Sequence, residues 1–591
     1  MIITVWAPSA KTVELVTTGH RIALHPGADG DWQGDVDESL LQRGYRYSID
    51  GGAPIPDPRS RWQPDGVQGA SYAAAPLRPR EAAVDARGIE EHAAPFRQRP
   101  LRDAVIYELH VGTFTPEGTY AAAQAKLAHL IHLGVTHVEL MPLATFPGRR
   151  GWGYDGVDLY APFPAYGTSQ ELAAFIDACH ARGLAVLLDV VYNHLGPDGN
   201  YLAQFGPYFT DRYRTPWGAA VNFDGAHSDG VRRFFIDNAV MWLRDYGFDG
   251  LRLDAVHAIF SFEALHVLEE LATAVRKLGE GLRRNFVLIA ESDLNDPRLV
   301  QPPLRGGFGL DAHWADDFHH AVHRFFTGET DGYYSDFHGL EDVATALRHG
   351  YVYQGQYSRH RGRRHGRPPR GVDTDQIVVS AQNHDQIGNR AQGERLSMML
   401  GLPEPKSIAA LTLLSPFVPL LFQGEEWGAK TPFLYFTDHE NAELGRLVAE
   451  GRSREFSSFS WQGTVPNPQE AETFTRSKLD WSEMSQPAHA ELLEWYRQLI
   501  RLRHGKMAAA PGTAARGARG RGRAAVKFDA AAGWLTFIHA GLLCVFNFAL
   551  AAQRVRLPSG EWDLVLRSDR PQAEPAGDMS GQAVFIYRRR G

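Results

Sequence analysis

The sequence has few of the features that mark secreted, membrane-bound or nucleic-acid-binding proteins. Its 591 residues include only two cysteines, Cys179 and Cys544, which fall in different predicted domains, so we expect buried thiols rather than a disulfide framework. The net charge is only -8, from 69 acidic and 61 basic side chains, so nothing favours a polyanionic partner. We therefore expect neutral substrates and no nucleic acid as partner.

Long hydrophobic runs are missing as well. The most apolar stretch, IAALTLLSPFVPLLF (408–422), is interrupted by polar residues and prolines and is too short to cross a bilayer, so we predict a helix, a turn and a buried strand. The amino-terminal MIITVWAPSAKTVELV alternates as a strand does and lacks the basic start and small-residue cleavage site of a secretory signal. The sequence therefore predicts a cytoplasmic protein with no membrane partner.

The chain is too long for one hydrophobic core, and its patterns divide it into three predicted domains. Residues 1–92 hold short alternating runs separated by Gly, Pro and Asp, which is typical of a β-sandwich. In residues 100–506, eight apolar runs alternate with amphipathic helices, which predicts an α/β fold, a (β/α)8 barrel closed by a helix at 491–505. Residues 520–591 contain further strands and predict a carboxyl-terminal β domain of the sandwich type.

Two arginine-rich segments interrupt this pattern, at 358–370 and 510–523. The second is short and has no interleaved aromatic side chains on which bases would stack, so we predict a solvated connector rather than a nucleic-acid site. Its arginines are Arg516, Arg519, Arg521 and Arg523. We interpret 358–370 in the same way, although its place before the seventh strand could bring it near the active face of the barrel.

The helix between the third and fourth barrel strands shows the expected period of a helix that covers a barrel. Its predicted buried residues are Val231, Phe234, Phe235, Trp242 and Leu243, and its predicted polar residues are Arg232, Arg233 and Asp237. Ser228 stands just before this pattern and is a residue type that caps helices. We therefore predict that Ser228 caps the helix and that Arg232 faces solvent.

Four acidic segments close strand-like runs over nearly two hundred residues of the chain. They are AVLLDVVYNH (185–194), GLRLDAVHA (250–258), FVLIAESD (286–293) and VVSAQNHDQIG (378–388). Burying a carboxylate is costly, and the carboxyl ends of barrel strands meet at one face. The four segments therefore predict a single active site built from several strands.

Two carboxyl groups in these segments have contrasting surroundings. Arg252 and Asp254 are two apart on one strand, so their side chains leave from one face, and the guanidinium favours the ionised carboxylate that a nucleophile needs. Glu291 follows the apolar VLIA, which would raise its pKa and preserve the proton of a general acid. Asp385 follows His384, and both could bind sugar hydroxyls. Taken singly, each acid could instead be a structural ion pair or a helix cap, but together they predict retaining glycoside hydrolysis.

Aromatic side chains are the second requirement of a sugar site, because pyranose faces stack on them. Trp152 and Tyr154 stand between glycines in the loop after the second strand, and either could instead be loop core. No His/Cys cluster has metal-ligand spacing, and Asn193 has too few carboxylates near it for a calcium site, so we expect no metal and no cofactor.

The four segments resemble the conserved regions of the α-amylase superfamily of glycosidases, with DVVYNH, GLRLDAVHA, AESD and QNHDQ as the matching motifs. The resemblance implies Asp254 as nucleophile, Glu291 as acid/base and Asp385 as transition-state stabiliser. The residues expected to bind substrate are Trp152, Tyr154, Asp189, His194, Arg252, His257, Asp316, Asp317, Phe318, His319, His320, Asn383, His384 and Gln386.

Other segments narrow the resemblance. VWAPSAKTVELV is similar to the front domain of branching, debranching and trehalose-forming enzymes, while ELHVGTFTPEGTY (108–120), ADDFHH (315–320) and LLFQGEEWG (420–428) resemble the maltooligosyltrehalose trehalohydrolase family. This implies hydrolysis of the α-1,4 bond next to the terminal trehalose of maltooligosyl trehalose, with related α-glucans as further ligands. A glycogen branching enzyme, an α-1,6 debranching hydrolase and a catalytically inactive glycan-binding protein remain as alternatives; the three intact carboxyl groups argue against the last.

Overall fold

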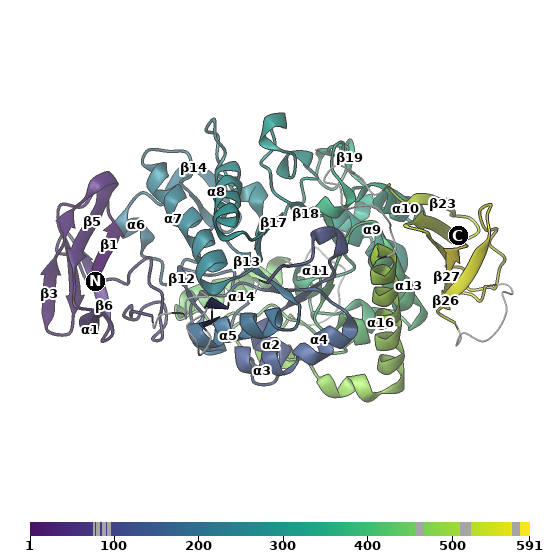
Figure 1. The fold of residues 1–591 in the computed structure, drawn as a ribbon, viewed down its shortest axis with the longest axis horizontal. Helices are drawn as coiled ribbons and strands as arrows, with labels where there is room; N and C mark the ends of the chain where they lie inside the picture. The colour runs from purple at the N-terminus through teal and green to yellow at the C-terminus, as the bar shows by residue number, and fades with distance from the viewer. Residues whose placement is uncertain are drawn as a thin grey trace.

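The computed structural model describes residues 1–74, 96–455, 465–508, 522–569 and 579–590, with Leu77, Ala83–Val84 and Glu90–Glu91 between the first two ranges. Most of the linker before Phe96 and the connector arginines Arg516, Arg519 and Arg521 lie outside the described residues. The molecule is elongated: an amino-terminal β domain and a carboxyl-terminal sheet lie at opposite ends of a central barrel (Figure 1). Over the described ranges, no helix is both long enough and apolar enough to span a membrane.

The amino-terminal domain consists of two small antiparallel sheets. One has the order β1-β5-β4 and the other the order β3-β2-β6. Their bounds are Ile2–Trp6 (β1), Val13–Thr17 (β2), His20–Ala23 (β3), His25–Pro26 (β4), Asp31–Asp35 (β5) and Tyr45–Ile49 (β6). Inward residues alternate with outward ones, as in β2, where Val13, Leu15 and Thr17 are buried and Glu14 and Val16 are not, so the sheets bury one face each. Two ion pairs join the domain to the barrel. Nη1 of Arg59 lies 2.8 Å from Oδ2 of Asp237, and Nη1 of Arg61 lies 3.0 Å from Oδ2 of Asp245.

The prediction of a (β/α)8 barrel is confirmed. Eight parallel strands close on themselves in the order β9-β10-β13-β16-β17-β18-β21-β22. Their bounds are Ile106–Leu109 (β9), His137–Leu140 (β10), Ala185–Val190 (β13), Gly250–Leu253 (β16), Val287–Ala290 (β17), Ala312–Trp314 (β18), Ile377–Ser380 (β21) and Val418–Phe422 (β22). Helices cover the outside while Ile106, Leu187, Ile289 and Val378 fill the inside, which explains why the strands read as unbroken apolar runs.

The outer helices follow the strands in turn. Their bounds are Tyr120–Ala125 (α3), Leu127–Leu133 (α4), Ser169–His180 (α5), Ser228–Met241 (α7), Val267–Leu282 (α8), Asp316–Thr327 (α9), Leu340–His349 (α10), Pro403–Leu414 (α13) and Pro487–Ala508 (α16). The helix-turn-strand prediction for 408–422 is confirmed by α13 and β22, and the predicted closing helix lies within α16. Further helices lie in the loops: Val111–Phe114 (α2), Leu202–Phe205 (α6), His384–Gly388 (α11), Leu396–Met399 (α12), Ala442–Glu455 (α14) and Ala471–Arg476 (α15).

Two predictions for α7 are wrong, although its five predicted buried residues are indeed buried. Arg232 does not face solvent: it is 6% exposed, and its Nη1 pairs with Glu270 at 2.8 Å. A buried guanidinium is tolerated here because its Nε also donates to the carbonyl of Phe223. Ser228 is the first helical residue instead of the cap; the capping position is His227, whose φ of 61° turns the chain into the helix without a side-chain cap.

The carboxyl-terminal domain is a five-stranded antiparallel sheet in the order β23-β24-β25-β27-β26. The strands are Ala525–Asp529 (β23), Trp534–His539 (β24), Leu542–Asn547 (β25), Trp562–Arg567 (β26) and Ala583–Arg589 (β27). The domain packs on the barrel: the Phe548 ring lies 4.9 Å from that of Phe325 in α9, and Lys406 in α13 donates to the carbonyl of Ser568. The two cysteines are buried in α5 and β25.

Candidate active site

A cavity of about 590 Å³ lies at the carboxyl ends of the barrel strands. Asp254, Glu291 and Asp385 all line it, and they follow β16, β17 and β21 respectively. Barrel closure therefore brings together three carboxyl groups from segments that are far apart in the sequence. This is the arrangement predicted from the acidic strand ends.

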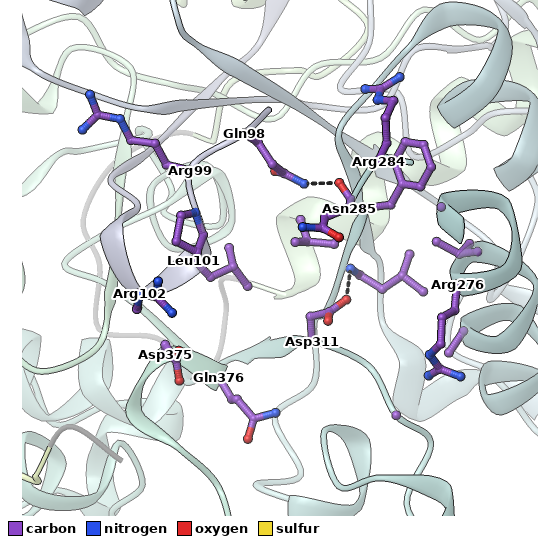
Figure 2. Close-up of a pocket in the computed structure, with 18 of the residues that line it drawn as sticks. Gln98, Arg99, Leu101, Arg102, Arg276, Arg284, Asn285, Asp311, Asp375 and Gln376 are labelled. Carbon is purple, nitrogen blue, oxygen red and sulfur yellow. Dashed lines mark hydrogen bonds between the residues drawn. The ribbon is translucent and has the colours of Figure 1, made fainter. Parts of the chain in front are cut away.

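A larger cavity of about 1000 Å³ lies at the other end of the barrel (Figure 2). Its wall includes Leu101, Val287, Asp311 and Gln376, which stand before or at the beginning of barrel strands. The carboxylate of Asp311 accepts a hydrogen bond from the backbone N–H of Leu288, drawn as a dashed line in Figure 2. This contact stabilises the start of β17. None of the predicted site residues lines this cavity. In barrel enzymes this end serves stability, so the smaller cavity is the candidate active site.

Asp254 is held by two donors. Nη1 of Arg252 lies 2.7 Å from its Oδ1, and Nδ2 of Asn193 lies 2.7 Å from its Oδ2. The same Nη1 lies 2.8 Å from Asp189, because the parallel register places Asp189 opposite Arg252 on the neighbouring strand. Both oxygens of Asp254 thus accept hydrogen bonds that fix the orientation of the side chain. Asn193, which the sequence suggested only as a candidate calcium ligand, orients the carboxylate of Asp254.

Asp189 and Arg252 form the buried base of the site. Arg252 is fully buried and stacks over the Trp314 ring with 4.3 Å from guanidinium carbon to ring centroid. Burial raises the pKa of Asp189 to about 6, with Arg252 opposing this effect. The hydroxyl of Tyr154 donates to Asp189 at 2.6 Å. These contacts lock the Asp189 side chain below the cavity, where it supports Arg252 and Tyr154.

Glu291 has the opposite environment to Asp254. Burial raises its pKa well above the usual value, and the nearby carboxylates of Asp254, Asp316 and Asp385 add to the shift. Its Oε2 accepts the backbone N–H of Ala255, which has a left-handed φ of 39°. That backbone conformation is strained for alanine and turns the chain directly after Asp254. A carboxyl group whose pKa is raised by burial is suited to general acid catalysis.

Asp385 lies in the first turn of α11, directly after β21, and its side chain is 42% exposed to the cavity. Its neighbour His384 is fully buried, and Glu108 on β9 accepts a hydrogen bond from Nδ1 of that ring. Burial alone would lower the pKa of His384, but Asp385 and Glu108 outweigh it and raise the pKa to about 9. His384 is therefore a cation, and its Nε2 lies 2.7 Å from the Tyr154 hydroxyl.

Aromatic rings line the cavity on one side. Tyr154 stacks against His384 with ring centroids 5.2 Å apart, while Trp152 packs mainly in the loop core, where its Nε1 donates to the carbonyl of Leu434. Trp217 is 46% exposed at the tip of the hairpin β14 (Phe209–Thr215) and β15 (Gly218–Val221). It stacks on His194 at 5.3 Å. The exposed face of Trp217 thus offers a platform at the cavity rim.

The segment ADDFHH contributes less to the cavity than expected. Only Asp316 is electrostatically close to the carboxyl groups: burial, with Asp293 and Asp385 nearby, raises its pKa to about 7. Asp317 accepts the backbone N–H groups of Val352 and Tyr353 and so fixes a loop. The other three residues lie away from the cavity: Phe318 in the main core, His319 between Ala381 and Tyr334, and His320 against Tyr333.

Asn383 and Gln386 face their own helix rather than the cavity. The Asn383 side chain accepts the N–H of Asp385, and Gln386 accepts the N–H of Asn383, which together form a capping box at the start of α11. They set the direction of the helix that carries Asp385. His257 and His194 line the cavity as expected, and the Nε2 of His194 bonds to the carbonyl of Tyr154.

Several functional residues were missed in the sequence. Glu108 lies in the middle of a strand and pairs with His384 only through barrel closure. Trp217 stands at the tip of a hairpin, and no role was predicted for it. The segment 358–370, expected as a solvated loop, forms a hairpin whose Arg361 pairs at 2.7 Å with Asp293 in the cavity wall. The position of this segment before the seventh strand was the one feature of the sequence that indicated a place near the active face.

No group of three or more His, Cys, Asp or Glu side chains in the described ranges is arranged to hold a metal ion. Asp254, held by two hydrogen-bond donors, and Glu291, whose pKa is raised by burial, line one cavity beside an imidazolium and an exposed aromatic ring. This combination can attack and protonate a glycosidic bond from its two sides.

Comparisons with known proteins agree with this geometry. A family model for the catalytic domain of α-amylase matches residues 87–215. A malto-oligosyltrehalose trehalohydrolase from Rhizobium sp. (strain M-11) is 48% identical over 92% of this chain and 90% of its own length. A 1,4-α-glucan branching enzyme from Bacillus caldolyticus is 34% identical over only 52% of this chain and 50% of its own. The crystal structure of a putative α-amylase from Salmonella typhimurium superposes with a TM-score of 0.87 at 37% identity, covering 100% of this chain and 97% of that one. The chain therefore belongs to the malto-oligosyltrehalose trehalohydrolase family.

Proposed function

We propose that this protein is a retaining hydrolase of the α-1,4-glucosidic bond next to the terminal trehalose of a maltooligosyl trehalose, and that it releases free trehalose. One observation carries the proposal most strongly. Asp254 is fixed by Arg252 and Asn193, while the pKa of Glu291 in the same cavity is raised well above its usual value. A fixed carboxylate and a carboxyl group that resists losing its proton are the pair that hydrolysis of a glycosidic bond needs, and the resemblance to the α-amylase superfamily implies that Asp254 is a nucleophile and the mechanism retaining.

In the first step, the Asp254 carboxylate attacks the anomeric carbon of the glucose unit before the cleavage point. The bond from that carbon to O4 of the trehalose unit breaks, and Glu291 transfers its proton to this oxygen, so trehalose leaves as a neutral molecule. A covalent ester joins the maltooligosyl group to Asp254. Because the donated proton comes from a group with a raised pKa, the step can proceed near neutral pH.

In the second step, Glu291 is ionised and accepts a proton from water. The water oxygen attacks the same anomeric carbon, the ester bond to Asp254 breaks, and the maltooligosaccharide leaves with its original α configuration. Glu291 regains its proton and Asp254 its negative charge. The two inversions at one carbon explain why the configuration is retained.

Asp385 and its neighbours would stabilise the positive charge that develops on the sugar ring in the transition state of each step. The Asp385 carboxylate is partly exposed to the cavity, and the buried His384 cation, whose Nε2 lies 3.5 Å from Oδ1 of Asp385, holds the Tyr154 hydroxyl in place. Tyr154 and Trp217 present ring faces on which a pyranose can stack. These contacts strengthen as charge develops on the sugar, which is how electrostatic preorganisation accelerates a reaction.

A direct test incubates the protein with maltooligosyl trehalose, maltoheptaose and amylose, followed by chromatography of the products. Free trehalose as the main product supports the proposal. New α-1,6 branches in amylose would identify a branching transferase instead, and no turnover would indicate a glycan-binding protein. Asp254→Ala and Glu291→Gln should each abolish turnover, with circular dichroism unchanged. We also propose a cytoplasmic reaction, since the two buried cysteines lie in different domains and supply no disulfide framework.

A further inference from the structure

The helix α14, in the loop after β22, forms part of the cavity wall. Val448, Gly451 and Arg452 line the cavity, and their spacing of three and four residues places them on one helix face. No motif in this segment indicated a role in the site. The helix therefore brings side chains to the cavity that belong to neither a strand end nor an acidic segment.

Arg452 connects α14 to the short helix that carries Asp385. Its side chain is buried, with the residue 8% exposed. Nη1 donates to Oδ1 of Asn389 at 2.9 Å, and Nη2 donates to the carbonyl of Gly388. The guanidinium also lies over the Tyr435 ring, 5.0 Å from its centroid. Two hydrogen bonds and one stacking contact fix the planar group in a single orientation.

The contact with Asn389 decides which end of that amide faces Asp385. A guanidinium has only donors, so it selects the amide oxygen of Asn389 and leaves the NH2 group on the other side. Nδ2 of Asn389 lies 3.3 Å from Oδ1 of Asp385. Arg452 thus directs a hydrogen-bond donor at a carboxylate that is otherwise partly exposed to the cavity.

The start of α14 is held by Asp198. Asp198, in the loop after β13, accepts the backbone N–H of Glu440 at 2.9 Å and of Asn441 at 3.1 Å. Its second oxygen accepts from Nε2 of Gln68 in the amino-terminal domain at 3.2 Å. A carboxylate at this end of a helix also complements the helix dipole. The place of Arg452 is therefore set by contacts that extend to the first domain.

We propose that Arg452 is a positioning residue for Asp385, acting through the amide of Asn389 rather than by touching the substrate. The inference rests on the proposed function, because it takes Asp385 as the group that stabilises the charged sugar ring. Loss of Arg452 would free the Asn389 amide to rotate and leave the Asp385 carboxylate less well oriented. A misplacement of about 1 Å near a reacting centre can lower the rate about 100-fold.

The test compares Arg452→Met, Arg452→Lys, Asn389→Ala and the double variant Arg452→Met/Asn389→Ala, on the α-glucan that the wild type cleaves fastest. We expect Arg452→Met to lower kcat about 10- to 100-fold with KM changed less than about 3-fold. Arg452→Lys keeps one donor and should recover part of the rate. The double variant should be no slower than Asn389→Ala alone, because both changes remove the same contact. Arg446→Met, on the exposed face of α14, is the matched control and should behave as wild type.

Three results would overturn the inference. Losses that multiply in the double variant would show that Arg452 acts independently of Asn389, and a raised KM with unchanged kcat would show direct substrate contact. Wild-type rates in Arg452→Met would show no role at all. If Arg452→Met fails to fold by circular dichroism, Arg452→Lys against Asn389→Ala gives the same comparison. Failure of the wild type to release trehalose would contradict the proposed function. This result is measured separately from the ratios of kcat between the variants and the wild type.

Discussion

Glu139 provides a test of how the interior of the barrel is charged. It lies on β10, is 1% exposed, and neither of its carboxyl oxygens has a hydrogen-bond partner among the described residues. Burial raises its pKa well above 4.5, with the charges of Glu108 and Asp189 adding to the shift. The native protein therefore keeps Glu139 protonated to a higher pH than the unfolded chain does. The unfolded chain releases this proton, which favours unfolding.

The magnitude follows from the two pKa values. A raised native pKa means that the contribution of Glu139 to stability is fully present below pH 4.5 and is lost as pH rises toward the native pKa. Each pH unit in this window costs about 1.4 kcal/mol. Glu139→Gln is neutral in both states and removes this pH dependence. Relative to wild type, the variant should therefore gain about 1.4 kcal/mol for each pH unit between 4.5 and the native pKa of Glu139.

The assay is urea denaturation of the barrel at pH 4.5, 5.5 and 7, followed by tryptophan fluorescence. The difference in free energy of unfolding between variant and wild type should grow with pH, whatever its value at pH 4.5. Glu280→Gln, on the exposed surface of α8, serves as control for the substitution itself. An equal pH dependence in Glu139→Gln and wild type would refute the reasoning, because it would mean that Glu139 is ionised in the native barrel.

Three further changes probe the cavity. Gly388→Ala would place a Cβ atom 2.0 Å from the Trp152 ring, so we expect a loss of about 1–3 kcal/mol in stability, read as a lower Tm. Trp217→Ala removes the exposed platform and should raise KM about 5- to 10-fold with less effect on kcat, in Michaelis–Menten kinetics with maltooligosyl trehalose; an unchanged KM would place the sugar elsewhere. The pH profile of kcat/KM should fall on its alkaline side as Glu291 loses its proton, at a pH well above 4.5. An alkaline limb near pH 4.5 would show that Glu291 is not the general acid.

The parts of the site that the sequence predicted are those coded in consecutive residues. A carboxyl group at the end of an apolar run, as in VLIAE, indicates both a strand and the end of it that carries function. Closure of the barrel then brings the carboxyl ends of all the strands to one face. Arg252 and Asp254 were predicted to share a face because the strand period is two, and they do, with Nη1 bonded to Asp254. The fold class follows from the same alternation of strands and helices.

The parts that could not be predicted depend on register and on loop geometry. Glu108 finds His384 only because β9 and β21 both neighbour β22 in the closed barrel. Trp217 and Arg452 come from a hairpin tip and a loop helix whose position no periodicity determines. ADDFHH resembled a substrate-binding segment as a whole, but the turn of α9 points Phe318 into the core. A helix distributes neighbouring residues over all its faces, and resemblance does not resolve this.

The central claim is that the enzyme cleaves maltooligosyl trehalose next to its trehalose unit with retention. Proton NMR of the reaction, recorded before the sugars mutarotate, tests both parts at once. The account predicts free trehalose and an equal amount of maltooligosaccharide whose new reducing end is first the α anomer. An initial β anomer, or new α-1,6 linkages without free trehalose, would contradict it.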